Sequence, residues 1–488
     1  MKKLLYILAS VAVVMMASCS DEFLEKKKQG EQSSEDFYKT QDGLEGQLIA
    51  AYSELKNYRY ISNRFFLGDV ASDDATKGSE PGDFVSAKEI EEFRATSSNF
   101  QFHSWWWTRI YRGIYYANLT IEKADVVEDI TEEDKNRIVG EARFLRAYYY
   151  SELVRSFGGV PLFDEVPDVG NYAIPRATAE EVYQLIEEDF AYAATVLPRK
   201  SELLDEEIGH ATREAAIGLL GKAYLYQEKW GQAKTEFQKI IDMTDYYLIP
   251  NYGEQFTLAG ENGPESIWEI QFFESKSESS AWRNGGNFST VFVMPRNIWG
   301  WGLMQPTQDL YDAYETGDPR REATIIVRGE EIEGEVQAGS DDVTGYYSRK
   351  DFLKPSERPT LSSRNSPLNE IVIRLADVYL MYAEAAYHTG DETNAKKYVN
   401  EVRKRARAGD NTILPDVTSS GAQLLKDIYH ERRVELALEH HRFWDVIRTG
   451  RGDELLHENF TPGKNELFPI PQAEIDASFG AITQNPGY

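Results

Sequence analysis

Cysteine is almost absent from this chain of 488 residues, which contains only Cys19. A single thiol excludes an intramolecular disulfide and any zinc site built from several cysteines. Basic residues are also scarce, because 53 lysines and arginines stand against 81 aspartates and glutamates, and the formal net charge is -28. Proteins that bind nucleic acid need clustered positive charge to displace counterions from phosphates. The composition therefore argues against a nucleic-acid partner.

Familiar catalytic motifs are missing too. The sequence has no G-x-S-x-G elbow, no phosphate-binding loop and no H-E-x-x-H pair. Its seven histidines are dispersed except for His440 and His441, and neighbouring helical positions point about 100° apart, which does not suit a shared metal. We predict packing or capping roles for these two histidines. We therefore expect no catalytic residue, no cofactor and no metal, and we do not expect an enzyme.

The N-terminus is typical of an exported lipoprotein. Lys2 and Lys3 precede a largely apolar stretch over 4–17, which is too short to span a bilayer. Small residues follow and lead directly to Cys19. We predict that residues 1–18 are a signal peptide, that Cys19 is lipidated, and that residues 19–34 form a linker. Two or more acyl chains would hold the protein stably at a membrane surface.

Apolar residues recur at helical spacing through most of the chain, so the predicted fold is mainly α. The sequence predicts an N-terminal helical region over 35–244, an irregular insertion over 245–370, and a C-terminal helical region with a tail over 371–488. Helices are predicted near 35–57, 104–127, 132–157, 178–197, 211–228, 231–243, 371–389, 392–407 and 421–448. In the last of these, Arg432 and Glu435 are three residues apart and can pair, as can Arg442 and Asp445.

Two segments carry the signature of tetratricopeptide-like helical pairs. Leu220, Gly221 and Tyr224 fall on the first predicted helix, and Ala233 and Phe237 fall on the next. Small residues at these positions let two helices approach, and large residues fill the groove between neighbouring pairs. A second, looser pair contains Ala383, Ala386, Gly390, Ala395 and Val399. Such pairs bury their apolar faces only by stacking, so we expect a helical-pair scaffold.

The insertion over 245–370 has a different character. It is rich in glycine, serine, asparagine and aromatic residues, and its short β-like runs lie at 266–273 and 324–328. We expect an irregular, partly β subdomain that packs on the helices. Trp268 lies in an alternating run and is predicted to be in the core.

Motifs spread over most of the chain resemble those of one protein family. They include A-R-F-L-R-A-Y at 142–148, F-P-I-P at 468–471 and Q-N-P-G-Y at 484–488. Further matching segments lie at 21–24, 107–114, 117–118, 158–162, 373–385, 399–406, 431–437 and 441–445. With these motifs the chain is similar to the SusD-like (RagB/SusD) family. The resemblance implies an outer-membrane lipoprotein that faces the cell exterior, captures oligosaccharide or polysaccharide, and acts as a hinged lid on a SusC-like TonB-dependent transporter.

Candidate ligand-binding residues follow from the chemistry of sugars. The C–H faces of pyranose rings stack on aromatic rings, and their hydroxyls bond to polar side chains. Two stretches combine both residue types, the insertion and the loop over 69–102. The candidates are Trp282, Asn284, Trp299, Trp301, Tyr346 and Tyr347 in the insertion, and Asp69, Asp73 and Asp74 in the loop. The three aspartates also raise the alternative of a Ca²⁺ site, although they lack an EF-hand register.

Other functions remain open from the sequence. The same architecture could capture a peptide or another nutrient. A surface hydrolase and a purely structural helical-repeat adaptor are further alternatives, and the missing motifs disfavour the hydrolase.

Overall fold

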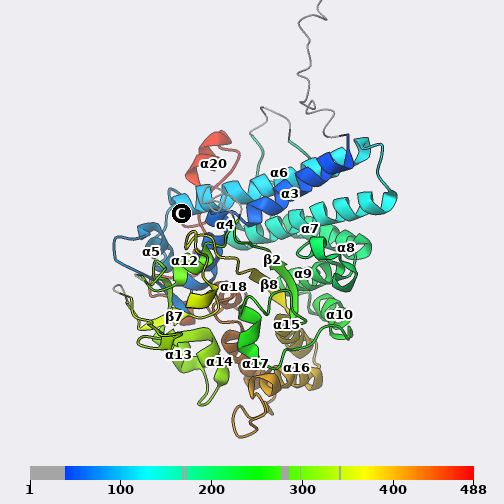
Figure 1. Cartoon of the computed structure of the whole chain (residues 1–488). Coiled ribbons are helices and arrows are strands. Elements are labelled where there is room, and N and C mark those ends of the chain that lie inside the picture. Colours follow the sequence, from blue (N-terminus) through cyan, green and yellow to red (C-terminus); the bar gives the residue numbers. More distant parts are fainter. Residues whose placement is uncertain (1–38, 168–169, 171–172, 276–284, 297, 340–341) are drawn as a thin grey trace, which may run out of the picture.

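The computed structural model describes residues 39–167, 170, 173–275, 285–296, 298–339 and 342–488 (Figure 1). Cys19, Trp282 and Asn284 lie outside these residues. The described chain is mainly helical, as the sequence predicts, and none of its helices is long and apolar enough to cross a membrane. The α-helices are α3 Gln41–Leu55, α4 Tyr58–Phe65, α5 Val85–Glu91, α6 Thr108–Lys123, α7 Glu132–Phe157, α8 Ala179–Val196, α9 Arg213–Tyr226, α10 Trp230–Ile241, α12 Ser289–Val293, α13 Gln308–Ala313, α14 Pro319–Thr324, α15 Leu375–His388, α16 Glu392–Ala406, α17 Gly421–Leu436, α18 Arg442–Arg448, α19 Gly452–Leu455 and α20 Gln472–Ala477.

Short segments of tighter or wider helix link these elements. The π-helical segments are η2 Phe66–Val70 and η3 Gln101–Trp107, and the 3₁₀ segments are η4 Ala124–Val126, η5 Lys200–Glu202, η6 Asp205–Glu207, η7 Tyr252–Phe256 and η8 Pro355–Glu357. π-helical segments are rare and frequently occur at functional sites. The segment η3 leads directly into α6.

The scaffold is a stack of helical pairs. Helix α7 packs on α8, α8 on α9 and α9 on α10, and α10 then packs on α15, which packs on α16 (Figure 1). A methyl group on Gly221 of α9 would lie 2.5 Å from Cε1 of Phe237 on α10. This close approach confirms the predicted small-residue contact within the pair. In the second predicted pair, Ala395 and Val399 are fully buried, and Gly390 closes the turn with a φ of 79°.

Helix boundaries follow from local capping. The Thr131 hydroxyl accepts the N–H of Asp134 at the start of α7, where acidic residues in the first turn favour the helix dipole. The helix ends at Gly158, whose φ of 70° suits glycine. Helix α8 begins with a capping box between Thr178 and Glu181.

The predicted long helix over 421–448 is wrong in one respect. The helix breaks into α17 and α18 because Leu438 and His440 adopt φ values of 63° and 67°, which helices do not accommodate. The predicted pair of Arg432 and Glu435 does not form. Arg432 instead binds Asp377 and Asp445.

Short antiparallel strands join the insertion to the rest of the chain. The strands are β1 Ala75–Gly78, β2 Ser266–Ile270, β3 Leu303–Pro306, β4 Ile325–Val327, β5 Glu331–Ile332, β6 Glu335–Val336, β7 Tyr346–Ser348 and β8 Glu370–Arg374. They pair as β1–β3, β2–β8, β4–β7 and β5–β6. Because β1 precedes the insertion and β3 lies within it, the insertion shares a sheet with the N-terminal region.

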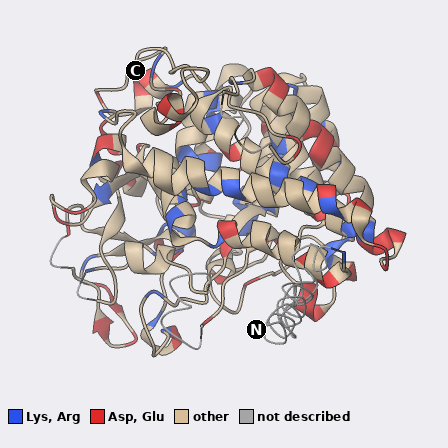
Figure 2. Ribbon diagram, turned by 90° about the horizontal axis from the view of Figure 1, so that it is seen from above, with Lys and Arg blue, Asp and Glu red and all other residues tan. Residues whose placement is uncertain are grey.

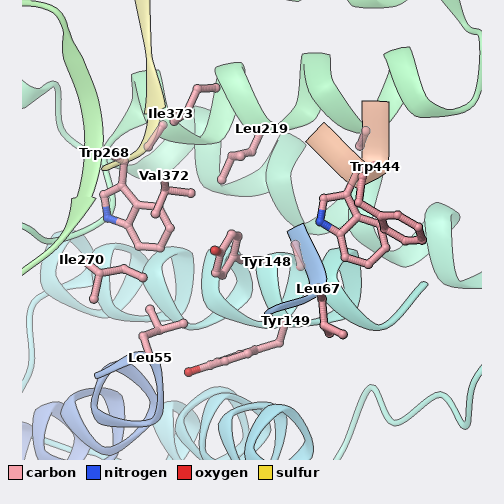
Figure 3. Packing of buried hydrophobic residues seen from close by; sticks show 14 of the residues in the cluster. Leu55, Leu67, Tyr148, Tyr149, Leu219, Trp268, Ile270, Val372, Ile373 and Trp444 are labelled. Carbon is pink, nitrogen blue, oxygen red and sulfur yellow. The ribbon is translucent and has the colours of Figure 1, made fainter. Parts of the chain in front are cut away.

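One large apolar core takes its residues from the helical pairs and from part of the insertion. Figure 3 shows some of these residues from close by. Trp268 is 3% exposed and meets the rings of Phe144 and Tyr148 edge-on at 4.8 and 5.1 Å. Its predicted core position is therefore confirmed. A smaller cluster gathers Met294, Ile326, Tyr347 and Phe352 within the insertion.

The C-terminal tail is tied to the core. The Asn485 amide donates to the carbonyls of Phe157 and Phe468 at 3.1 and 2.7 Å. Its oxygen accepts a hydrogen bond from Arg176 at 2.7 Å. This buried amide has partners on both ends, which holds the last residues in place.

Candidate functional site

A row of partly exposed aromatic rings lies on the surface where the N-terminal region meets the insertion. We call Tyr58, Phe84, Phe100, Trp105 and Trp301 the aromatic arc. The Trp105 ring lies 5.5 Å from Phe100, 5.8 Å from Tyr58 and 6.0 Å from Phe84. Phe84 in turn lies 6.3 Å from Trp301. Phe100 is 46% exposed and the other four rings are partly exposed.

The sheet formed by β1 and β3 brings distant parts of the arc together. Gly78, the last residue of β1, pairs with Leu303, the first residue of β3. Trp301 lies two residues before Leu303, and the loop that carries Phe84 starts just after Gly78. The ladder therefore sets the rings of Phe84 and Trp301 against each other.

Phe84 has an unusual backbone conformation. Its φ of 44° lies in the left-handed region, which is uncommon for residues other than glycine and is unfavourable for a bulky side chain. The residue also forms the N-terminal boundary of α5 without a side-chain cap. Such strain concentrates at functional sites, where the surrounding structure holds it in place.

Buried rings support the arc from below. Phe292 of α12 is 1% exposed and meets Trp301 edge-on at 4.7 Å. Phe288, also 1% exposed, lies 5.2 Å from Tyr58. Because both supports are fixed in the core, the exposed rings above them have little freedom to reorient.

Positive groups border the arc. The Arg59 guanidinium lies 5.5 Å from the Tyr58 ring and donates to its hydroxyl at 3.0 Å, and Arg364 lies 5.6 Å from Trp301. On the other side, Arg296 is bonded to Asp83, next to Phe84. Elsewhere both signs of charge occur on the same helices (Figure 2). Flat rings beside hydrogen-bond donors suit a ligand with an apolar face and polar edges.

The predicted tryptophans and tyrosines separate in the structure. Trp301 belongs to the arc, whereas Trp299 packs on the smaller cluster near Arg358. Tyr346 stacks on Tyr311, which is not part of the arc, with ring centroids 4.8 Å apart. Tyr347 is fully buried and its hydroxyl accepts the N–H of Gly339, so the expectation that this side chain faces a ligand is wrong.

The three predicted aspartates hold the fold together. Asp69 is 0% exposed and bonds to His440 at 2.5 Å, and Asp74 is 0% exposed and accepts from Arg433 at 2.7 Å. Both oxygens of Asp73 accept from Arg442 at 2.7 Å. The expectation that Asp69 and Asp74 face a ligand is therefore wrong, because burial and arginine or histidine partners leave them no exposed surface.

Burial and the arginine contact have opposite effects on the pKa of Asp74. Burial raises the pKa of Asp74 to about 6, although Arg433 opposes the shift. Within the described residues, no group of acids, histidines or cysteines has the arrangement of a metal site.

Most rings of the arc were not among the named candidates. Phe84 and Phe100 lie within the loop over 69–102 that the sequence indicated as a binding segment. Tyr58 opens a helix and Trp105 belongs to η3, so both occupy patterns that usually indicate core packing. The useful signal was the density of aromatic residues at 100–107, F-Q-F-H-S-W-W-W.

The helical pairs and the arc define a class of protein, a tetratricopeptide-like helical scaffold with an aromatic surface site. Residues 264–488 match the family model described as the SusD family, and residues 22–225 match the one described as "Starch-binding associating with outer membrane". The chain belongs to the SusD family.

Relatives match over nearly their whole length. A structure called "Laminarin binding SusD-like protein" is 32% identical, with a TM-score of 0.82 over 92% of this chain and 100% of that chain. "Surface glycan-binding protein A from Bacteroides fluxus" is 26% identical, with a TM-score of 0.80 over 92% and 100% of the two chains. SusD-like protein P25 of Formosa agariphila is 27% identical over 96% of each chain.

Proposed function

We propose that this protein captures oligosaccharides at the cell surface through the aromatic arc. The observation that carries the proposal is the contiguous set of partly exposed rings, fixed from below and bordered by hydrogen-bond donors. Pyranose rings stack on such surfaces. The similarity to a laminarin-binding SusD-like protein supports the same ligand class.

The proposal extends to delivery. The captured saccharide passes to a SusC-like TonB-dependent transporter in the outer membrane, for which this protein acts as a lid. Lipidated Cys19 holds the protein on the outer face of that membrane. The supporting facts are the lipoprotein pattern at 1–19 and the match over 22–225 to a family described as associating with the outer membrane.

Binding to the arc is tested by isothermal titration of the mature protein with laminarihexaose and other neutral hexasaccharides. Trp105→Ala and Trp301→Ala should each weaken binding by about 1 kcal/mol or more. Trp230→Ala is the matched control. Trp230 of α10 is also partly exposed, but its ring stacks on His388 with centroids 4.1 Å apart and is not part of the arc. Equal losses of affinity in all three variants would contradict binding at the arc. If new reducing ends appear when the protein is incubated with the saccharides, the protein is a hydrolase.

Delivery has separate tests. The full-length protein should co-purify with a large outer-membrane barrel, and Cys19→Ala should release it from the membrane fraction. Mass spectrometry of the N-terminal peptide should find acyl chains on Cys19. An unmodified thiol would contradict the anchor without affecting the binding result.

A further inference from the structure

Two cations flank Tyr58 of the aromatic arc in the chain. Lys56 ends α3 and Arg59 lies in the first turn of α4, on either side of Tyr58 in the chain. Among the described residues, neither side chain forms an ion pair with a carboxylate. Two buried lysines elsewhere do have acidic partners, since Lys222 pairs with Asp377 and Lys350 with Glu439.

Lys56 lies two residues before Tyr58 of the arc, and its ammonium lies against two further aromatic rings. Its ammonium lies 4.5 Å from the Phe273 ring and 5.9 Å from the Phe272 ring. The N–H of Phe273 donates to the carbonyl of Gly285 at 3.2 Å, and Phe288, three residues further on, touches Tyr58. The segment that carries the two rings beside the Lys56 ammonium therefore returns to the Tyr58 ring of the arc.

The position of this ammonium is unfavourable in the free protein. Burial lowers the pKa of Lys56 to about 8. Two phenylalanine rings attract a cation through their faces, but they replace only part of the lost hydration. An anionic group at the arc would supply the missing partner.

The charge of the whole chain makes a local positive site necessary for such a ligand. With a formal net charge of -28, the protein repels anions at long range. At physiological ionic strength this repulsion is screened beyond about 8 Å, so nearby cations decide what binds. Asp83, the carboxylate next to Phe84, is held by Arg296 and does not oppose an anion at this rim.

We infer that the aromatic arc takes an anionic saccharide, whose carboxylate or sulfate group is received by the ammonium of Lys56 and the guanidinium of Arg59. This inference rests on the proposed capture of oligosaccharides and specifies their chemical class. The rings bind the apolar faces of the sugar, and the two cations select for its charge.

The test compares ligands that share one backbone. Isothermal titration uses laminarihexaose, the same hexasaccharide oxidised to carboxylates at C6, and a sulfated form, at about 0.01 M and about 0.15 M ionic strength. At low ionic strength we expect at least one charged form to bind about ten-fold more tightly than the neutral parent, a difference of about 1.4 kcal/mol. The two charged forms distinguish a uronate from a sulfate ester.

Variants assign the preference to the two cations. Lys56→Met keeps the aliphatic stem and should reduce the preference to within about two-fold, while binding of neutral laminarihexaose stays the same. Arg59→Met should reduce the preference as well, beyond any loss of neutral binding that follows from removing a donor at the arc. Lys56→Arg should retain it. Lys426→Met, at an exposed lysine of α17, is the control and should change nothing.

Each alternative outcome has a distinct meaning. If neutral and charged forms bind equally, or if Lys426→Met reduces the preference as much as Lys56→Met, the inference is overturned and saccharide capture stands. If no saccharide binds and the arc variants behave as wild type, the proposed function fails together with the inference.

Discussion

His440 and Asp69 form a buried pair, with Nδ1 of the imidazole 2.5 Å from a carboxylate oxygen. The other ring nitrogen lies 2.8 Å from Glu370. Each nitrogen faces an acceptor, so both carry a proton and the ring is an imidazolium. Burial lowers the pKa of His440, but the charges of Glu370 and Asp69 outweigh burial and raise it to about 10.

This pair predicts how stability depends on pH. An unfolded histidine has a pKa of about 6.5, so the folded protein binds the proton more tightly. The stabilisation is complete below about pH 6.5 and is lost as the pH rises through about 10. We expect the free energy of unfolding, measured by denaturant titration, to decline between those values. His440→Gln should remove much of that decline.

NMR titration of the His440 ring in the folded wild-type protein is an independent check. A ring that loses its proton near pH 6.5 would contradict the ion pair, whatever the stability of the variant. His457 is the control, because it is partly exposed and forms no ion pair among the described residues.

Glu435 lies at the centre of a buried charge network. One oxygen lies 2.6 Å from Arg374 and also bonds to Arg405, and the other lies 3.0 Å from Arg320. Burial would raise the pKa of Glu435, but three guanidinium groups lower it well below its usual range. The carboxylate therefore keeps its charge in the core.

Glu435→Gln should destabilise the protein by about 3–5 kcal/mol, because it leaves buried arginines without their counter-charge. The measurement is the free energy of unfolding in denaturant. Glu401→Gln is the control, since its pair with Lys404 is exposed and 3.9 Å long, and it should cost about 0–1 kcal/mol. Similar effects of the two changes would argue against the network.

The helical scaffold could be predicted because its signals are local. Helix α7 occupies 132–157 as predicted, since a threonine cap and a glycine stop lie within the sequence itself. The contact of Gly221 with Phe237 was also predictable, because small and large residues alternate at helical spacing.

Contacts between distant residues could not be predicted in the same way. Spacing suggested that Arg432 pairs with Glu435, but buried acids from α15 and α18 bind Arg432, and other arginines bind Glu435. The arc has the same origin, because Phe84 and Trp301 come together only through the pairing of β1 with β3. Periodicity in the sequence indicates which face of a helix or strand is apolar, but it does not indicate which distant residues that face contacts.

Gly221 provides a direct test of the helical pair. Gly221→Ala places a methyl group 2.5 Å from the Phe237 ring, which must move, so we expect a loss of about 1–3 kcal/mol. Gly231→Ala in α10 of the same pair is the matched control. A methyl group there meets open space, and alanine favours a helix by about 0.5–1 kcal/mol over glycine. In denaturant titration, the free energy of unfolding should therefore fall in Gly221→Ala and rise in Gly231→Ala. Equal changes in the two variants would exclude the close approach of Gly221 to Phe237.

Phe84 allows backbone strain to be separated from ligand contact. Phe84→Gly and Phe84→Ala both remove the ring between Trp105 and Trp301, so each should weaken oligosaccharide binding in isothermal titration. Only glycine also relieves the left-handed conformation, which costs other residues about 1–2 kcal/mol. Phe84→Gly should therefore be the more stable of the two variants in denaturant unfolding, with the same loss of binding.

If both variants bind as wild type, Phe84 supports the surface without touching the ligand, and the arc divides into two separate aromatic patches. If glycine restores no stability relative to alanine, the conformation at this residue is not strained.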